Sequence, residues 1–156
     1  MRRSDAARAK QILSEILYIT IATVDAAGRP WNAPVYSAYD EEYNFYWASA
    51  IHSEHSRNIR GNPNIFLVIY DSTVPEGTGE GVYIQAKAYE LADEHETKAA
   101  LRYYYGRANK APPSASAFLG SRPRRIYKAV PERVWMNDLK EVDDTTIDVR
   151  IEIELT

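Results

Sequence analysis

The chain has 156 residues, 45% of them hydrophobic, which is enough for one domain with its own core. A net charge of −3 provides no overall positive field to attract nucleic acid, and the lack of cysteine excludes disulfides, thiolate metal sites and thiol nucleophiles. No apolar run reaches membrane-spanning length, and the first residues lack the apolar core of a secretory signal. We therefore expect a cytoplasmic protein that binds neither nucleic acid nor membrane.

The first half of the chain predicts a helix followed by a meander of strands. Residues 1–17 have apolar positions at helical spacing from Ala9 to Leu17, and Ser4 is placed to cap the helix. Three segments with β-branched or alternating residues follow, separated by turns. These three predicted strands are 18–25, 30–40 and 41–49.

The second half returns to strands after one helix. Residues 64–71 are apolar nearly throughout and predict a strand covered on both faces, and 81–91 alternate, so 18–91 form the barrel strands. A helix is expected at 93–106, capped by Asp93 and ended by Gly106. A long loop at 107–125 precedes the closing strands at 126–156, the first of them broken at Pro131.

The arrangement of these elements favours a closed sheet. Several short antiparallel strands with two interposed helices are better accommodated by a barrel than by an open sheet, because closure removes the edge strands. We therefore predict a mainly β fold, an antiparallel barrel with peripheral helices, in a single domain covering residues 1–156.

The segment FYWASAIHSEHSRNIRGNP, residues 45–63, carries the clearest candidate site. Its strand places Phe45 and Trp47 on one face and Tyr46 and Ala48 on the other, so that one face can pack while the other meets a ligand.

A short helix follows this strand, with Ser53 as its N-cap and Gly61 at its end. The free amide groups of a helix N-terminus, with His55, Ser56 and Arg57 beside them, suit a phosphate. A phosphate site next to an aromatic strand fits a phosphorylated flavin. The alternative is a serine-capped helix in solvent, which is a common surface feature, and spacing alone does not separate the two.

The sequence from residue 18 to residue 71, followed by 81–91, resembles the pyridoxamine 5'-phosphate oxidase-related family of FMN-binding split barrels. The resemblance implies a split barrel, FMN as cofactor, and a homodimer with each flavin at the subunit interface. It also implies the residues that contact the flavin. The ring strand matches Asn32, Ala33, Pro34, Val35 and Tyr36. The next strand matches Tyr46, Trp47, Ala48 and Ser49. The phosphate segment matches Ser53, His55, Ser56 and Arg57. Trp135 is the candidate contributed by the partner subunit, and the alternative is that it is a buried aromatic of the barrel.

Two departures from the family pattern bear on function. Glu54 and His55 stand where the family carries an Arg-Lys pair, so the phosphate charge falls to Arg57, to His55 or to a basic residue elsewhere. Arg122, Arg124 and Arg125 could reach the phosphate across the dimer, but a solvated loop is the favoured interpretation of these three. The family's C-terminal arginine and histidine motif for the vitamin phosphate is missing, so the resemblance does not extend to that substrate.

The leading functional hypothesis is an FMN-dependent oxidoreductase acting on a small molecule, with no catalytic side chain assigned. Tyr103, Tyr104 and Tyr105 either wall the substrate or form the packing face of their helix. A non-catalytic flavin carrier or sensor is the main alternative, and deazaflavin could replace FMN. His52 and His55 could also bind haem or a metal, but zinc would need a third ligand and no motif supplies one, so no metal site is predicted.

Overall fold

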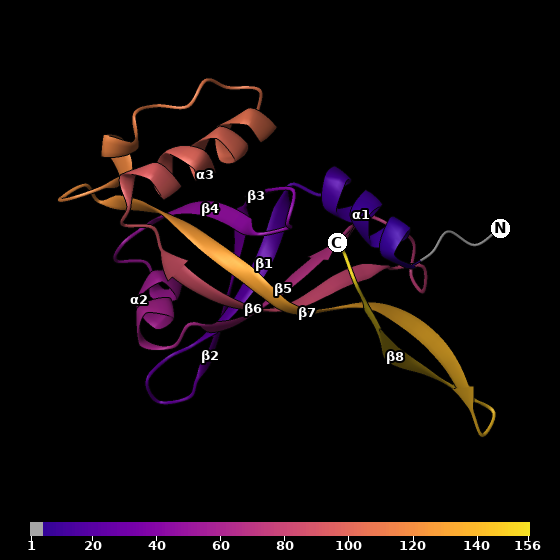
Figure 1. Cartoon of the computed structure of the whole chain (residues 1–156). Helices are drawn as coiled ribbons and strands as arrows, with labels where there is room; N and C mark the ends of the chain where they lie inside the picture. The colour runs from indigo at the N-terminus through magenta and orange to yellow at the C-terminus, as the bar shows by residue number, and fades with distance from the viewer. Residues whose placement is uncertain (1–4) are drawn as a thin grey trace.

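The computed structural model describes residues 5–156, arranged as Figure 1 shows. The helices are α1 (Asp5–Glu15), α2 (Glu54–Gly61) and α3 (Glu94–Arg107), with a 3-10 turn, η1 (Ala115–Phe118). The strands are β1 (Tyr18–Val24), β2 (Pro30–Tyr36), β3 (Ala38–Tyr39), β4 (Phe45–Ala50), β5 (Asn64–Tyr70), β6 (Gly81–Glu90), β7 (Arg124–Val142) and β8 (Thr145–Ile153). Ser4, the expected cap of the first helix, lies outside the described residues. Within residues 5–156, no helix is long and apolar enough to cross a membrane.

The strands form one antiparallel sheet that curls into a barrel. Its order is β2-β1-β5-β6-β7-β4-β3, and β8 pairs with β7 outside this path. Only Ser37 separates β2 from β3, so the two ends of the order are joined through the chain. The predicted mainly β split barrel with peripheral helices is confirmed.

The barrel core follows from the alternation of the strands. In β1, Ile19 and Ile21 point inward and are almost fully buried, while Thr20 and Ala22 are half-buried on the outer face. The helices add to the same core: α1 contributes Leu13 and α2 contributes Ile59. This packing fixes α2, which begins with the segment predicted to bind phosphate, against β1 and β2.

β4 has the two faces that the sequence predicts, but both are packed. Phe45 and Trp47 belong to the barrel core. Tyr46 belongs to a second cluster, formed where α3 and η1 cover the outer face of β4 with Leu101 and Phe118. The side chain of Tyr46 is therefore not free to meet a ligand.

The prediction that the strand at 64–71 is covered on both faces is wrong for the single chain described by residues 5–156. β5 alternates between buried and exposed residues, with Phe66 37% and Tyr70 48% exposed. An apolar sequence shows that side chains avoid water, but it does not show whether the same chain or another one covers them.

The predicted break at Pro131 is also wrong, because β7 runs without interruption from Arg124 to Val142. Gln85 pairs with Arg133 and Ala86 with Pro131, so Glu132 is an extra residue in a β-bulge. Proline has no N–H to donate, and a bulge interrupts the ladder at that point anyway. β7 and β8 then extend as a long hairpin away from the barrel (Figure 1).

The end of the second predicted helix differs by one residue. Asp93 caps α3 as expected, with its side chain accepting a hydrogen bond from the backbone N–H of Glu96 at 2.8 Å. Gly106 is helical, however, and the helix ends at Arg107. Arg107 donates to the backbone carbonyls of Leu13 at 2.7 Å and Ile16 at 2.9 Å, so it ties α3 to the end of α1.

Candidate functional site

The start of α2 has the geometry that the sequence predicts. Ser53 is the N-cap, and its hydroxyl accepts from the backbone N–H of Ser56 at 3.4 Å. Between α2 and β1, the buried Asn58 Nδ2 donates to Thr23 Oγ1 at 3.0 Å. This buried bond holds the helix against β1, because breaking it would leave two polar groups unpaired.

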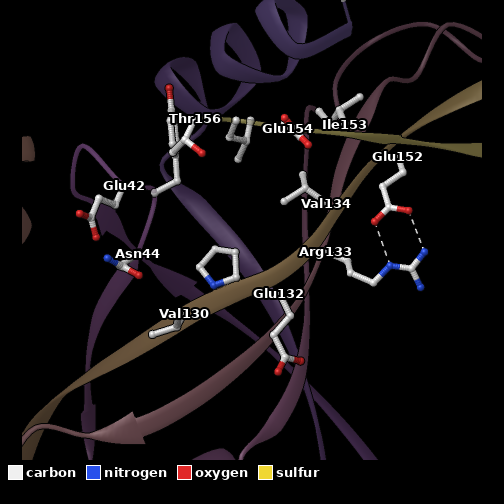
Figure 2. A pocket seen from close by; sticks show the side chains of 13 residues that line it. Glu42, Asn44, Val130, Glu132, Arg133, Val134, Glu152, Ile153, Glu154 and Thr156 are labelled. Atoms are coloured by element: carbon white, nitrogen blue, oxygen red, sulfur yellow. Dashed lines mark hydrogen bonds and ion pairs between the residues drawn. The ribbon is translucent and has the colours of Figure 1, made fainter.

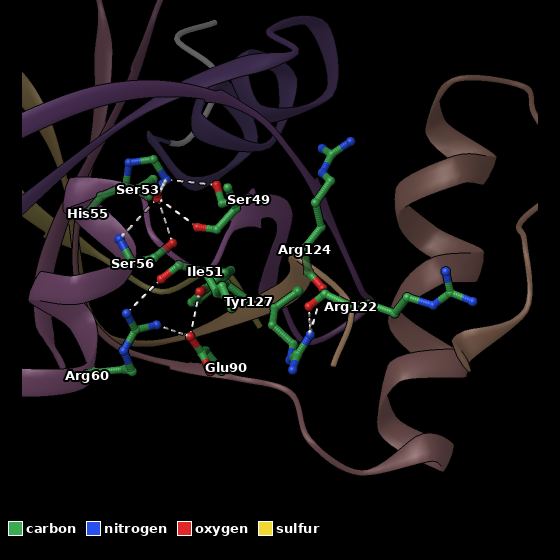
Figure 3. A network of polar contacts seen from close by, with 12 residues as sticks. Ser49, Ile51, Ser53, His55, Ser56, Arg60, Glu90, Arg122, Arg124 and Tyr127 are labelled. Carbon is green, nitrogen blue, oxygen red and sulfur yellow. Dashed lines mark hydrogen bonds and ion pairs between the residues drawn. The ribbon is translucent and has the colours of Figure 1, made fainter. Parts of the chain in front are cut away.

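Four of the residues predicted to meet the ribityl chain and phosphate lie together, as Figure 3 shows. His55 Nε2 is 2.7 Å from Ser49 Oγ and 3.1 Å from Ser53 Oγ. Ser53 Oγ donates to Ser56 Oγ at 2.7 Å. Burial lowers the pKa of His55 below its ordinary value of 6.5, so the ring is neutral at pH 7. The cluster offers hydrogen-bonding groups without adding positive charge.

A second polar network, which was not predicted from the sequence, lies beside this cluster. Glu90 Oε1 accepts from Tyr127 Oη at 2.7 Å and from Arg60 Nη1 at 2.5 Å, and Arg60 also donates to the carbonyl of Ile51 at 2.6 Å (Figure 3). These contacts join β6, β7 and α2. No sequence spacing connects Glu90 with Arg60, so only the folded chain reveals the pair.

Arg57, the predicted phosphate cation, lies at the surface. Its side chain is 58% exposed, and its Nη2 is 3.3 Å from Glu54 Oε2, one turn earlier in the same helix. An exposed pair of this kind contributes little to stability, so the arginine can be redirected toward a ligand at small cost.

The three loop arginines, Arg122, Arg124 and Arg125, lie near the C-terminal end of β4, where Ala50 pairs with Arg124. Arg125 donates to the backbone carbonyls of Gly120, Arg122 and Arg124, so its role is to hold the loop in shape. Arg124 remains exposed beside the candidate site.

β2, the predicted ring strand, has one free edge. Across residues 30–36 it pairs with β1 alone, as far as residues 5–156 show. Val35 points into the core and Ala33 is half-buried, whereas Asn32 and Pro34 are exposed on the outer face. Tyr36 is half-buried, and its hydroxyl is buried with no hydrogen-bond partner in the described chain.

The side chains of two predicted flavin contacts are part of the packed structure. Trp47 is fully buried and stacks on Tyr127 with ring centroids 5.7 Å apart. Tyr46 stacks on Tyr103 at 6.0 Å and donates to Asp40 Oδ2 at 2.8 Å. Contacts between this strand and a flavin would therefore be made by its backbone and by Ala48, which is half-buried.

Trp135 lies on the outer face of the sheet, outside the barrel core. Its ring stacks on Phe66 with centroids 6.2 Å apart, and the guanidinium of Arg133 lies 4.7 Å from its ring centre. This position leaves part of the ring accessible to a second molecule, as the prediction for Trp135 requires.

A cavity of about 980 Å³ lies at the base of the β7–β8 hairpin, away from the predicted flavin residues (Figure 2). Glu42, Glu132 and Glu154 line it, and its one arginine, Arg133, is already paired with Glu152 through bonds of 2.9 and 2.8 Å. Glu132 pairs with Lys87 at 3.4 Å, but the carboxylates of the lining outnumber its one arginine and repel a phosphate, so this cavity is unsuited to FMN. Within residues 5–156, no three His, Asp or Glu side chains are grouped to hold a metal ion.

The half-buried His55 predicts a pH dependence of stability. Because its pKa is lowered on folding, the unfolded chain binds a proton more tightly, and stability should fall as the pH drops from above 6.5 through the folded-state pKa. His55→Gln should reduce this fall, since glutamine does not titrate. Urea unfolding of flavin-free protein at about pH 7.5 and about pH 5.5 measures it. Exposed His52→Gln is the control, and an unchanged pH dependence in His55→Gln would contradict the prediction.

The chain is similar in fold to many solved structures, among them the following three. A haem-binding protein from Mycobacterium smegmatis has a TM-score of 0.69 and 18% identity, covering 96% of this chain and 59% of its own. A FAD-binding protein from Mesorhizobium loti has a TM-score of 0.66 and 20% identity, covering 86% of this chain and 95% of its own. An F420 reductase has a TM-score of 0.60 and 19% identity, covering 86% of this chain and 98% of its own.

The sequence matched no curated protein. A sequence model described as pyridoxamine 5'-phosphate oxidase matches residues 6–138, a span that includes the barrel, α2 and α3. The chain therefore belongs to the pyridoxamine 5'-phosphate oxidase family.

Proposed function

We propose that the protein is a cytoplasmic FMN-dependent oxidoreductase that acts on a small molecule as a homodimer, with each flavin between the subunits. The observation that carries this proposal is that β2 has a free backbone edge and packs against α2, whose start is rich in hydroxyls. Family membership supports it, because the matched span contains both elements.

The ring end of FMN fits the free edge of β2. The flavin ring carries carbonyls and an N–H along one side, and an unpaired strand edge offers alternating N–H and C=O groups. Asn32 adds an exposed side-chain amide on the same strand. When bound, FMN supplies the transfer of a hydride or of electrons, while the protein holds and orients it.

The phosphate end fits the start of α2. The hydroxyl of Ser53 and the ring of His55 already lie within one network, beside the free amides of the first helical turn. The hydroxyl of Ser56, which is fully buried, accepts from Ser53 and completes this network. Since His55 is neutral at pH 7, the positive charge has to come from Arg57 or from an arginine of the adjacent loop.

The homodimer is supported by the outer face of the sheet. Phe66, Val68, Tyr83 and Trp135 point outward from β5, β6 and β7, next to the exposed residues of β2. Covering such a face is favourable, at about 25 cal/mol for each Å² of apolar surface buried. A partner seated there would also lie close to the flavin strand.

Phe66→Glu should therefore separate the subunits and release flavin at the same time. A charge in the middle of an apolar interface is costly, and a site completed by two subunits loses its ligand when they part. Light scattering coupled to gel filtration measures the mass, and the visible spectrum measures the flavin. Val74→Glu, an exposed loop position, should change neither. A monomeric Phe66→Glu that retains flavin would rule out the shared site.

The test of the function itself is the visible spectrum of the protein as purified and after addition of FMN, followed by turnover of NADH or NADPH with an electron acceptor. Flavin bands that co-elute with a dimer, together with turnover, support the proposal. Bound flavin that no nicotinamide reduces would favour a carrier. A haem Soret band would overturn FMN as the cofactor. We do not expect this result, because His52 is exposed and the His55 Nε2 atom that would bind iron is already engaged by two serines.

A further inference from the structure

The distal part of the β7–β8 hairpin pairs with no other strand within residues 5–156. β6 pairs with β7 only as far as Met136. Residues 138–149, which we call the arm, form pairs only between β7 and β8. The arm extends away from the barrel (Figure 1), and the family match ends at residue 138, where the arm begins.

The arm carries exposed apolar side chains on both faces. Val142 and Ile147 lie on one face and are 40% and 41% exposed, and Leu139 lies on the other face and is 60% exposed. A two-stranded hairpin by itself is only marginally stable in water and gains stability when a face packs against another surface. We therefore expect the arm to be covered by a second surface.

The charge of the arm is strongly negative. It contains one cation, Lys140, and five carboxylates. Within residues 5–156, only one of the five forms an ion pair, Asp148 with Arg150. The surface that suits this arm is therefore positively charged and partly apolar. The five carboxylates are those of Asp138, Glu141, Asp143, Asp144 and Asp148.

A groove with both properties lies between the exposed side of α3 and the loop that follows this helix. Its volume is about 710 Å³, and its cations are Lys98, Arg102 and Lys110, against one carboxylate, Glu94. Within residues 5–156, none of these three cations forms an ion pair. The groove therefore favours an anionic partner.

The apolar wall of the groove is rigid. Pro112 and Pro113 form part of it, and their rings fix the backbone angle φ. The loop is anchored just beyond them, because Ala115 and Phe118 are buried in one cluster with Leu101 of α3. A preformed groove of this size is far larger than a single ion needs, since one water molecule occupies about 30 Å³. It suits a segment of protein.

The arm and the groove of one chain lie at opposite ends of the molecule. Figure 1 shows α3 and its loop at one end and the tip of the β7–β8 hairpin at the other. The arm of a chain therefore does not reach the groove of the same chain, and the partner that brings a matching arm is a second copy.

We propose that the arm of one copy docks in the α3 groove of a second copy, and that the two copies exchange their arms reciprocally. The carboxylates of the arm face the groove cations, and its apolar side chains pack against the two prolines. A reciprocal contact of this kind closes a two-fold dimer, because each copy presents the same two surfaces. The proposal does not rest on the flavin site, since no predicted flavin residue belongs to the arm or the groove.

The first experiment is cross-linking, which is selective here because the chain contains no cysteine. The full chain carrying Thr145→Cys on the arm and Gly106→Cys in the groove is treated with a short bis-maleimide, which links only the introduced thiols. A Cβ added at Gly106 meets no atom within 4 Å, so this change leaves α3 intact. The expected product on a denaturing gel is a covalent dimer.

Two controls show whether the cross-link reports this contact. Each single variant, and Thr145→Cys combined with Ser72→Cys in the exposed loop before β6, should stay monomeric on the same gel. If the arm–groove pair gives no more covalent dimer than these controls, the proposal is overturned. A ladder of longer products would overturn the reciprocal arrangement, because a head-to-tail contact does not close as a dimer.

Neutral variants of the arm test the role of charge in the same cross-linking assay. Asp143 and Asp144 have positive φ angles of 49° and 61°, which asparagine tolerates as aspartate does. Asp143→Asn with Asp144→Asn should therefore keep the turn and lower the cross-linking yield severalfold, because charges attracted across the interface are lost. The control Glu42→Gln with Glu76→Gln removes two exposed carboxylates outside the arm and should leave the yield unchanged.

The groove side is tested in the same way. Lys98→Gln with Arg102→Gln should also lower the yield severalfold. An unchanged yield in either the arm variant or the groove variant would overturn the pairing of arm and groove by charge.

This proposal and the proposed function can fail separately. If the arm–groove cross-link forms but the chain binds no flavin, the contact stands and the proposed function falls. If flavin bands co-elute with a dimer but the cross-link does not form, only the arm–groove contact falls.

Discussion

Arg57→Ala is expected to weaken FMN binding by roughly 10- to 100-fold, because a charge-assisted hydrogen bond to a phosphate contributes about 1.5–3 kcal/mol. The neutral ring of His55 cannot replace this charge, since its pKa is lowered by burial. Quenching of flavin fluorescence during a titration gives the dissociation constant. The free energy of unfolding should hardly change, because Arg57 is exposed and pairs only with Glu54.

Glu54→Gln should have the opposite effect and tighten FMN binding, because it removes the carboxylate that competes for Arg57 and repels the phosphate. Arg102→Ala, exposed on α3, serves as the control for a general loss of positive charge. If Arg57→Ala binds FMN as the wild type does, Arg57 is not a phosphate ligand, and the loop cations Arg122 and Arg124 take its place as candidates.

The sequence predicted the elements whose signals are local. Ser53 and Asp93 both cap helices where the pattern places them, and the alternation of β1 gives its inward residues correctly. It failed where a partner strand decides the outcome. Pro131 looks like a strand breaker in isolation, but opposite Gln85 and Ala86 it lies beside a bulge that tolerates its missing N–H.

The candidate site was only partly predictable for the same reason. Ser49, Ser53 and His55 lie within seven positions of one another, so a local reading groups them correctly. Glu90 and Tyr127, which support them, are distant in sequence and are positioned by β6 and β7. The ring contacts of Tyr36 with Tyr18 and Tyr104 likewise join segments that are far apart in the chain, and no spacing in the sequence connects them.

Trp47 shows how a residue can match a family's flavin strand and still have a different side-chain role. Its ring is fully buried against Tyr127, on the inner face of β4, whereas Ala48 points to the outer face. The side chain therefore stabilises the fold, and only the backbone of this residue remains available to the flavin. Mutations can separate the role of the side chain in stability from the role of the backbone in flavin binding.

Trp47→Ala should destabilise the protein by about 3–5 kcal/mol, the usual cost of removing a large buried aromatic side chain. Urea unfolding of flavin-free protein measures this, and Trp31→Ala, at a side chain 49% exposed, should change stability by less than about 0.5 kcal/mol. Trp47→Phe tests the role of the backbone: it keeps an aromatic ring beside Tyr127 and removes an indole N–H that has no partner within residues 5–156. The folded Trp47→Phe variant should bind FMN with wild-type affinity, whereas a tenfold loss of FMN affinity without a matching loss of stability would show that the indole itself contacts the flavin.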